Sequence, residues 1–146
     1  MIADLNEMEA DIRTEFETML DFVMGEQARR ATADQIERGL FTQLLILGAK
    51  LLLLFFQMRS QASERETVTL EDGSILPYHS EQKRTYFSIF GPIPLWRPYF
   101  YETGIGGQTP LDAELSLGLD RYSDLLRETV EYLAVYVPSY GQAMAI

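Results

Sequence analysis

Apolar residues recur at intervals of three and four between residues 2 and 28, and the acidic residues fall mostly on the other side of the helical wheel. This spacing predicts an amphipathic α-helix with one face directed at a core. Gly25 and the polar residues after it predict that the helix ends there. The apolar positions of this helix are Leu5, Met8, Ile12, Phe16, Met19, Leu20 and Val23.

A second helix is predicted over about 33–62. Thr32 and Gln35 match a capping box, in which the side chain of each residue binds the backbone amide of the other. Gly48 is unfavourable inside a helix, which predicts that another backbone approaches closely there. The apolar stripe widens until almost the whole circumference is apolar at residues 51–56. A helix of this kind must be covered on every side, so we expect the chain to self-associate.

Part of this helix invites comparison with a membrane span. The apolar run over residues 44–58 is shorter than the roughly 18 residues that a spanning helix needs, and Lys50 lies in its middle. We therefore interpret the run as a buried core helix and expect no membrane partner.

From Thr67 onward the period of the pattern changes from that of a helix to that of a strand. Residues 67–79 predict two short strands around a turn signal at Asp72–Gly73. Residues 84–101 predict two longer strands, and we expect the chain to turn between them at Gly91–Pro92.

The second of the longer strands contains Pro94 and Pro98, which lie on one face on either side of Trp96. A proline has no backbone amide to donate to a neighbouring strand, so these positions predict an edge strand.

Residues 102–107 predict a flexible loop, and residues 109–123 predict a short helical turn followed by a connector. Ser123 is expected to cap a helix that Pro138 ends, and Ser139 is expected to cap one more helix. That last helix stops after two turns without a cap, which predicts a truncated chain. The residues expected to face the core are Leu126, Val130, Leu133 and Val137.

Together these elements predict the α+β class, with two long N-terminal helices, a small antiparallel β-ribbon sheet and C-terminal helices. The helical hairpin (1–64), the β ribbon (67–101) and the helical region (109–146) are expected to form one domain, because 146 residues is a one-domain length.

Composition narrows the candidate chemistry. The chain has no cysteine, which excludes disulfides, thiol catalysis and cysteine-ligated zinc, and its one histidine, His79, cannot form a metal site alone. The sequence contains no nucleophile elbow, phosphate loop or histidine pair, and its acidic pairs fall on predicted helix faces, where solvated charge is the ordinary explanation. We predict no catalytic centre and no metal ligands in this chain, and an enzyme is the last of our hypotheses.

The formal net charge of −10 opposes binding to nucleic acid. Residues 83–101, however, contain three cations and no acid, together with a cluster of aromatic residues. Aromatic rings can stack on bases, and cations can contact phosphates. The candidate nucleic-acid-binding residues are Lys83, Arg84, Trp96 and Arg97. The alternative is an aromatic hairpin that packs on the apolar helix, with Arg97 hydrogen-bonded into a loop.

Several spaced motifs occur in a consistent order over residues 36–146, which include the apolar helix with its central glycine. Their positions are Gly91, Ile93, Leu95, Arg97, Tyr99 and Phe100 in the hairpin, Pro110, Leu111, Asp112, Leu115 and Leu117 in the following segment, and Tyr122, Ser123, Leu126, Ser139, Tyr140 and Ala143 at two helix starts. In this order and spacing the chain resembles the N-terminal region of bacterial insertion-sequence transposases of the Kra type, a DDE-like group.

The resemblance implies a non-catalytic region that scaffolds, oligomerises and helps to place transposon-end DNA in the bacterial cytoplasm. Relatives often have CxxC zinc pairs beside the hairpin, where this chain has "LEDGS" and "ETGIGG", so its ribbon would be held by packing. Residues 139–146 would open a helix-turn-helix, and the acids that bind Mg²⁺ would lie downstream. The competing hypothesis is an acidic module that binds itself or another protein through its apolar helix and aromatic edge strand.

Overall fold

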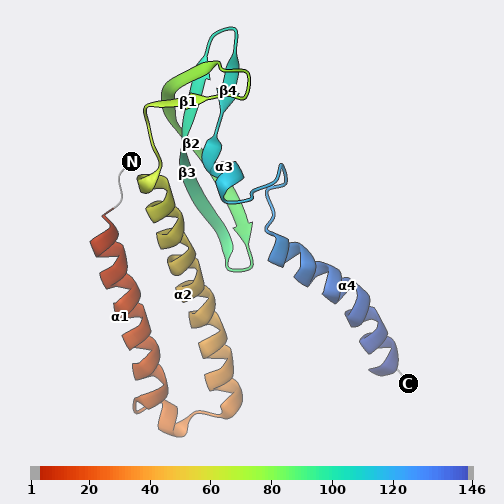
Figure 1. Ribbon diagram of the computed structural model, residues 1–146. Helices are drawn as coiled ribbons and strands as arrows, with labels where there is room; N and C mark the ends of the chain where they lie inside the picture. The colour runs from red at the N-terminus through yellow and green to blue at the C-terminus, as the bar shows by residue number, and fades with distance from the viewer. Residues whose placement is uncertain (1–3, 145–146) are drawn as a thin grey trace.

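The computed structural model describes residues 4–144, with side chains as far as Val135. Figure 1 shows two long helices in an antiparallel hairpin, a sheet beside the second helix, and a last helix that extends away from the sheet. The predicted α+β class is confirmed.

The first helix, α1, spans Leu5–Met24. Asp4 caps its N-terminus, because the carboxylate accepts hydrogen bonds from the amides of Asn6 (2.9 Å) and Glu7 (3.3 Å). The helix ends before Gly25, as predicted, and a 3₁₀ turn (η1, Ala28–Arg30) leads toward the second helix.

The second helix, α2, spans Ala33–Ala62, as the sequence predicts. The capping box is present, with the Thr32 amide 3.0 Å from Gln35 Oε1 and the Gln35 amide 3.1 Å from Thr32 Oγ1. A close approach does occur at Gly48, but the approaching group is a ring and not a backbone. A Cβ atom at Gly48 would lie 2.4 Å from the ring of Phe90.

The α1–α2 hairpin is held by a seam of half-buried side chains around the buried Met19. A second glycine of α2 admits a ring here, since a Cβ atom at Gly39 would lie 2.3 Å from Phe22 of α1. Lys50 of α2 crosses the seam to the carboxylates of Asp11 (2.9 Å) and Glu15 (3.1 Å) on α1. Its hydrogen bonds to these two carboxylates raise the pKa of Lys50, so the contact is an ion pair at neutral pH.

The sheet has four antiparallel strands in the order β1-β2-β3-β4. Two expectations are corrected. The second short strand and the first long strand form one continuous strand, β2, with a register shift between Tyr78 and Ser80. The expected loop 102–107 includes the start of β4, which is held by pairing with the end of β3. The bounds are Thr67–Thr69 (β1), Ile75–Ser88 (β2), Gly91–Glu102 (β3) and Gly106–Gln108 (β4).

The tight turn between β2 and β3 lies at residues 89–90, slightly before the predicted position. Gly91 begins β3 with a φ of 104°, in the region that favours glycine. The Ser88 hydroxyl donates to the Gly91 carbonyl (2.8 Å) and accepts from the Phe90 amide (3.0 Å), so a side chain of β2 closes the turn.

The prediction that β3 is an edge strand holds for the part that contains its prolines. β4 pairs with β3 from Phe100 to Glu102, so β3 is an inner strand there. Over residues 91–99 β3 pairs with β2, and Pro94 and Pro98 both lie in this part. The missing proline amides therefore leave the ladder with β4 intact.

The core lies between α2 and the face of β3 that is turned toward it. The ring of Tyr86 meets the ring of Phe56 edge-on, with centroids 5.2 Å apart. Leu95 is fully buried, which contributes roughly 2 kcal/mol to folding by its transfer from water. The buried residues of this cluster are Phe56, Ile93, Leu95 and Leu111.

A short helix, α3 (Pro110–Glu114), forms at the predicted helical turn, and the last helix, α4, spans Asp124–Met144. Ser123 caps α4 as predicted, because its hydroxyl accepts from the Leu126 amide (3.0 Å). The predicted helix end at Pro138 and new start at Ser139 are wrong, since α4 continues through both. The predicted inward face is also wrong, because α4 leaves the sheet after its start and exposes two of the expected core residues, Val130 and Leu133.

Candidate functional site

The four candidate nucleic-acid-binding residues lie on the β2–β3 hairpin, but they are divided between its two faces. Lys83 is directly opposite Trp96, and Arg84 is opposite Leu95, with Arg97 two residues further along β3. Successive side chains of a strand point to opposite faces. Arg84 and Arg97 therefore share the face of the buried Leu95, and Lys83 and Trp96 share the other face.

Arg97 is bound inside the molecule. Its guanidinium donates to the Asp112 carboxylate from Nε (2.7 Å to Oδ1) and Nη2 (3.3 Å to Oδ2), and from Nη1 to the Gln82 carbonyl (3.0 Å). Its side chain is only 11% exposed. The alternative hypothesis expects Arg97 to be hydrogen-bonded into a loop; in the structure it is bound within the chain, but its partners lie in the short helix α3 and in β2.

Arg84 binds the same carboxylate and also the connector that leads to α4. Its Nη1 is 3.3 Å from Asp112 Oδ2, and its Nη2 donates to the carbonyls of Asp120 (2.8 Å) and Gly118. Thr109 donates to Asp112 Oδ2 as well (3.2 Å). We call Arg84, Arg97, Thr109 and Asp112 the Asp112 cluster. It joins the sheet, α3 and the connector, and it engages both arginines within the chain.

The other face of the hairpin keeps Lys83 exposed and Trp96 half-buried. Glu81 lies near them on β2, but it binds Arg65 through two hydrogen bonds (2.8 and 3.2 Å) and accepts another from the Tyr78 hydroxyl (2.8 Å). Burial raises the pKa of Glu81, but the hydrogen bonds from Arg65 and Tyr78 outweigh it and hold the pKa below its ordinary value. Lys83 and Trp96 can contact one phosphate and one base, a small footprint for an acidic chain.

Most of the other motif positions whose side chains the structure describes pack within the fold. Leu115 and Leu117 pack against the core cluster that holds Ile93, Leu95 and Leu111. Tyr99 lies against Gly107 of β4, and a Cβ atom added at Gly107 would be 2.0 Å from the tyrosine hydroxyl. Phe100 is buried, Pro110 occupies the first turn of α3, and Tyr122 packs on Phe87 with ring centroids 5.3 Å apart. The side chains that lie outside the described residues are Val137, Ser139, Tyr140 and Ala143.

A second candidate surface is the uncovered apolar side of the helical hairpin. On α2 five exposed side chains, here named the α2 stripe, share one face: Phe41, Leu44, Leu51, Phe55 and Met58. At about 100° per residue they fall within a sector about 100° wide. The hydrophobic pattern of the sequence predicts an apolar surface at residues 51–56, which is part of the α2 stripe. It also predicts that other residues cover this surface, but the described part of the chain does not cover the stripe.

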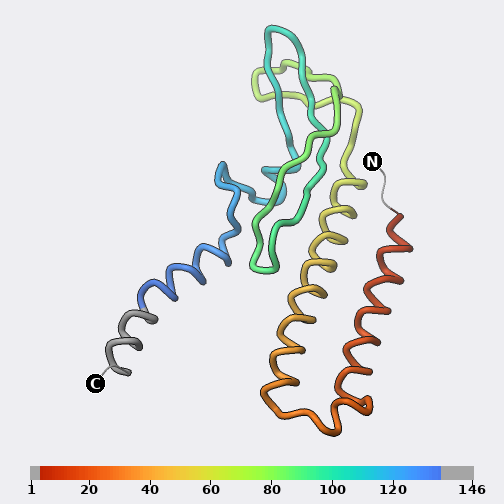
Figure 2. Tube along the Cα trace, turned by 180° about the vertical axis from the view of Figure 1, so that it is seen from behind, coloured from red at the N-terminus to blue at the C-terminus, as the bar shows by residue number. Residues whose placement is uncertain are grey.

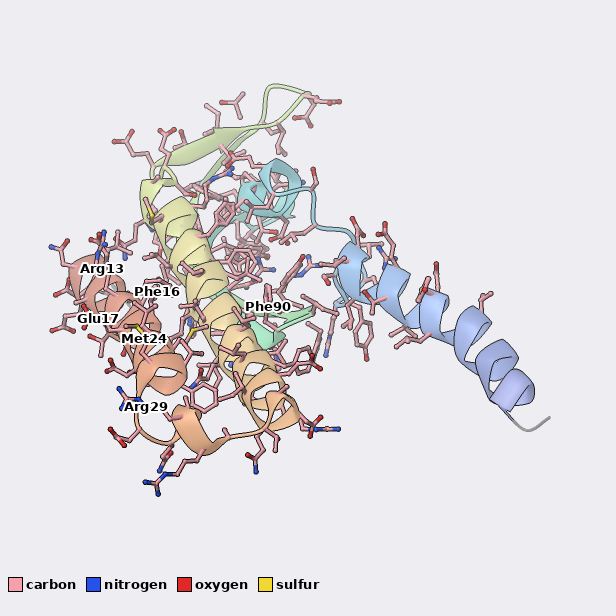
Figure 3. The ribbon with its side chains drawn as sticks, turned by 90° about the horizontal axis from the view of Figure 1, so that it is seen from below. Arg13, Phe16, Glu17, Met24, Arg29 and Phe90 are labelled. Atoms are coloured by element: carbon pink, nitrogen blue, oxygen red, sulfur yellow. The ribbon has the colours of Figure 1, made fainter. Side chains whose placement is uncertain are left out.

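The α2 stripe continues onto α1 across a shallow groove. This groove has a volume of about 460 Å³, and its apolar lining is formed by Ile12, Phe16 and Leu20 of α1 and Leu47 and Leu51 of α2. On the side of the stripe away from α1, the Phe90 ring lies on Gly48. Figure 3 shows Phe16 and Phe90 on the two sides of α2. One apolar surface thus runs from α1 across α2 to the tip of the β2–β3 hairpin.

The helix α4 exposes a third set of apolar side chains. Figures 1 and 2 show α4 and α1 on opposite sides of the molecule, with α2 and the sheet between them. In this arrangement α4 does not cover the groove of its own hairpin. The exposed apolar residues of α4 are Leu125, Val130, Tyr132, Leu133 and Val135.

The acidic side chains are dispersed over the fold. Among residues 4–144 no group of three or more His, Asp or Glu side chains is arranged to hold a metal ion.

The helix α2 is long and apolar enough, by length and composition, to cross a membrane. Its most apolar window has a mean hydropathy of 2.0, and only 6% of that window is buried. The expectation that residues 44–58 form a buried core helix is therefore wrong, because α2 leaves much of its apolar surface uncovered.

Comparisons with known proteins identify no relatives, because no protein-family model, no curated protein and no solved structure matches this chain.

Proposed function

We propose that this chain is a non-catalytic assembly module that self-associates through the apolar side of its α1–α2 hairpin. The observation that carries the proposal is the α2 stripe, in which Phe41 is 64% exposed and Leu44 is 52% exposed. Monomeric proteins rarely expose a contiguous apolar surface of more than a few hundred Å² unless something binds it. Covering this surface would stabilise the assembled state by the hydrophobic effect.

The biological setting that we propose is a DNA transposase, on the basis of the motif resemblance. In that setting the module would hold copies of the complete protein together at the transposon ends. Three of the motif positions make contacts within the fold, since Arg97 and Asp112 form one ion pair and Ser123 caps α4. Catalysis and Mg²⁺ binding would belong to a downstream region, where carboxylates would hold the metal for phosphoryl transfer.

A role in DNA placement is a second part of the proposal. Arg84 and Arg97 are engaged with Asp112, so the DNA contact of the hairpin falls to Lys83 and Trp96 on the opposite face. A contact with one phosphate gives little affinity against a net charge of −10. We therefore place this role in the complete protein, where further contacts would add to this one.

Sedimentation velocity over a concentration series tests self-association, with two matched variants of α2. Leu44→Ser removes an apolar side chain from the α2 stripe, and Ile46→Ser does the same on another face of the helix, where Ile46 is 44% exposed. We expect the unmodified chain to associate and Leu44→Ser to weaken association at least tenfold, because burial of about 1 kcal/mol or more is lost in each copy. Ile46→Ser should change association little.

The alternative outcomes of this measurement are distinct. A chain that stays monomeric at high concentration would refute self-association. Equal weakening by Leu44→Ser and Ile46→Ser would show that association is not directed by the α2 stripe.

A membrane is the alternative binding partner for the α2 stripe, and an experiment can distinguish membrane binding from self-association. Anionic lipid repels a chain of this charge, and α1 keeps Asp11 and Glu15 beside α2, where they bind Lys50. We expect the chain to stay in the soluble fraction when it is mixed with neutral or anionic phospholipid vesicles and floated on a density gradient. Flotation with the vesicles would favour membrane binding instead.

A further inference from the structure

The α2 stripe is nearly symmetric about its centre. Phe41 and Phe55 lie seven residues before and seven residues after Gly48, and Leu44 and Leu51 lie four before and three after it. A helix face with the same residues in both directions fits a partner helix that runs the opposite way. In that arrangement each ring meets a ring of the other copy, and each leucine meets a leucine.

Charged residues close the two ends of the stripe, and their signs are opposite. Glu37 lies eleven residues before Gly48, and Arg59 lies eleven residues after it. Both fall in the sector of the stripe, about 33 Å apart along the helix axis. Glu37 is exposed.

Arg59 is placed to meet a second copy. Its side chain is 42% exposed, and its guanidinium lies over the ring of Phe55, 5.8 Å from the centroid. Glu114 of α3 is its acidic neighbour within the chain, at 3.9 Å. This distance is at the outer limit for an ion pair and leaves Arg59 able to make a closer contact with another carboxylate.

We propose that two copies of this chain pair through the α2 stripe with their α2 helices antiparallel, about a two-fold axis at the level of Gly48 that lies on the α1 side of the Phe90 ring. This inference rests on the proposed function and specifies its geometry. Glu37 of each copy then faces Arg59 of the other copy, which gives an intermolecular ion pair at each end. A parallel pairing would instead set Glu37 against Glu37 and Arg59 against Arg59, so the charges select the antiparallel arrangement.

The size of the surface fits a stable dimer. The side chains of the α2 stripe and of Phe16 and Leu20 on α1 are each about half exposed. Fully buried aromatic side chains cover about 150–250 Å² each, so the set offers on the order of 700 Å² per copy, close to the roughly 800 Å² per partner of a standard interface. Two such hairpins that meet face to face form a four-helix bundle, which is a common way to bury apolar helix faces.

The test is a charge exchange at the two ends of the stripe, because each geometry predicts a different pattern. Glu37→Arg sets two arginines face to face at each end of an antiparallel dimer, and Arg59→Glu sets two glutamates there. We expect each single variant to raise the dissociation constant of the dimer roughly tenfold, because both ion pairs become repulsions. The double variant Glu37→Arg/Arg59→Glu restores both pairs with reversed signs and should recover the original dissociation constant.

A mixture of the two single variants gives a further readout, and it is interpreted together with the single variants because opposite charges also meet in a parallel heterodimer, which would associate more tightly than the unmodified chain. In an antiparallel heterodimer, the arginine introduced at position 37 of one chain faces the glutamate introduced at position 59 of the other, and the native residues at the opposite end also attract. We expect the mixture to associate about as tightly as the unmodified chain, although each variant alone associates weakly. Sedimentation velocity near 0.15 M salt measures this, since repulsion between the two acidic chains is screened over about 8 Å there. Circular dichroism checks that each variant is folded.

The outcomes separate this geometry from the proposed function. Recovery in the double variant and in the mixture supports the antiparallel pairing. Charge variants that associate like the unmodified chain, combined with a loss of association in Leu44→Ser, would overturn the geometry and leave self-association intact. An unmodified chain that stays monomeric would overturn both, and would assign the α2 stripe to another segment of a longer protein or to a different partner.

Discussion

The Asp112 cluster joins the sheet to α3 and the α2 stripe lies on the long helix that packs on the same sheet, yet one is closed and the other is open. In the cluster, the side chains of Arg84 and Arg97 are 15% and 11% exposed, and their donors engage Asp112 and backbone carbonyls. Along the stripe, Phe41 is 64% exposed and Met58 is 54% exposed. The cations that suggest nucleic-acid binding are therefore mostly structural, and the apolar helix offers the larger free surface.

The physical costs of the two surfaces explain this difference. A buried guanidinium without a partner is strongly destabilising, so a chain that buries two of them must supply acceptors within the fold. An exposed apolar side chain costs much less, and a folded monomer can tolerate several. A contiguous row of them is tolerated best when another molecule covers it. The polar cluster thus stabilises the fold, whereas the apolar stripe is the basis of the proposed association.

The largest expected effect on stability is at the closed region. Asp112→Asn removes the carboxylate that compensates the buried guanidinium of Arg97 and the largely buried one of Arg84, and we expect it to lower the free energy of unfolding by about 3 kcal/mol. Urea denaturation followed by circular dichroism measures the change. Asp124→Asn is the matched control, because the Asp124 side chain is 80% exposed and its ion pair with Arg127 is on the surface; it should change stability by less than about 0.5 kcal/mol. Similar losses of stability in the two variants would show that water solvates the charges of Arg84 and Arg97 when the Asp112 carboxylate is removed.

The next prediction compares the truncation of a leucine side chain at a buried position and at an exposed position. Leu95→Ala removes a fully buried side chain, and Leu51→Ala removes one that is 48% exposed on the α2 stripe. We expect Leu95→Ala to cost about 2–4 kcal/mol of stability because it leaves a cavity, and to leave the association constant of the remaining folded chain unchanged. Leu51→Ala should cost the monomer less than about 1 kcal/mol and should weaken association.

Denaturation at a low protein concentration and sedimentation at a high one separate the two effects of these leucine variants. If Leu51→Ala destabilised the monomer as strongly as Leu95→Ala, the stripe would already be buried in the monomer and the comparison between closed and open regions would fail.

Local signals in the sequence predict the starts of the helices well. The capping box of Thr32 and Gln35 fixes the start of α2, and the hydroxyl of Ser123 fixes the start of α4, because both are contacts between residues three apart. The end of α4 differs from the prediction because Pro138 lowers helix propensity without forbidding a helix. The helix propensity of a residue predicts the tendency of its segment to form a helix. It does not predict whether the adjacent helical turns are stable enough to continue through an unfavourable residue.

Contacts between distant residues are not predictable from the pattern. Arg97 and Asp112 are fifteen residues apart and lie in a strand and a helix, so no periodicity relates them. The strand β4 is three residues long with two glycines, and it exists because Phe100 and its neighbours pair with it. The α2 stripe is half visible in the sequence, since an apolar circumference predicts a covering but does not say which face the rest of the chain leaves open.

The smallest expected effect is the pH dependence that Glu81 contributes on the face of the hairpin opposite the Asp112 cluster. Hydrogen bonds from Arg65 and Tyr78 outweigh burial and place the pKa of Glu81 in the folded chain below its ordinary value near 4.5. The unfolded chain therefore binds a proton at this residue more readily than the folded chain. Its contribution to stability is fully present above the ordinary value and is lost as the pH falls through the folded value.

Glu81→Gln isolates this contribution. At pH 7 we expect the variant to be less stable than the unmodified chain by about 1 kcal/mol, since it keeps the shape of the side chain but loses the charge that Arg65 and Tyr78 recognise. The difference should shrink as the pH falls below the ordinary value of a glutamate, because the unmodified chain then becomes neutral at the same position. Urea denaturation of both chains at neutral pH and at two acidic pH values on either side of that ordinary value measures it. A difference that stays constant across this range would mean that Glu81 is held by its shape and packing, and that its charge contributes less to stability than the charge of Asp112 on the opposite face.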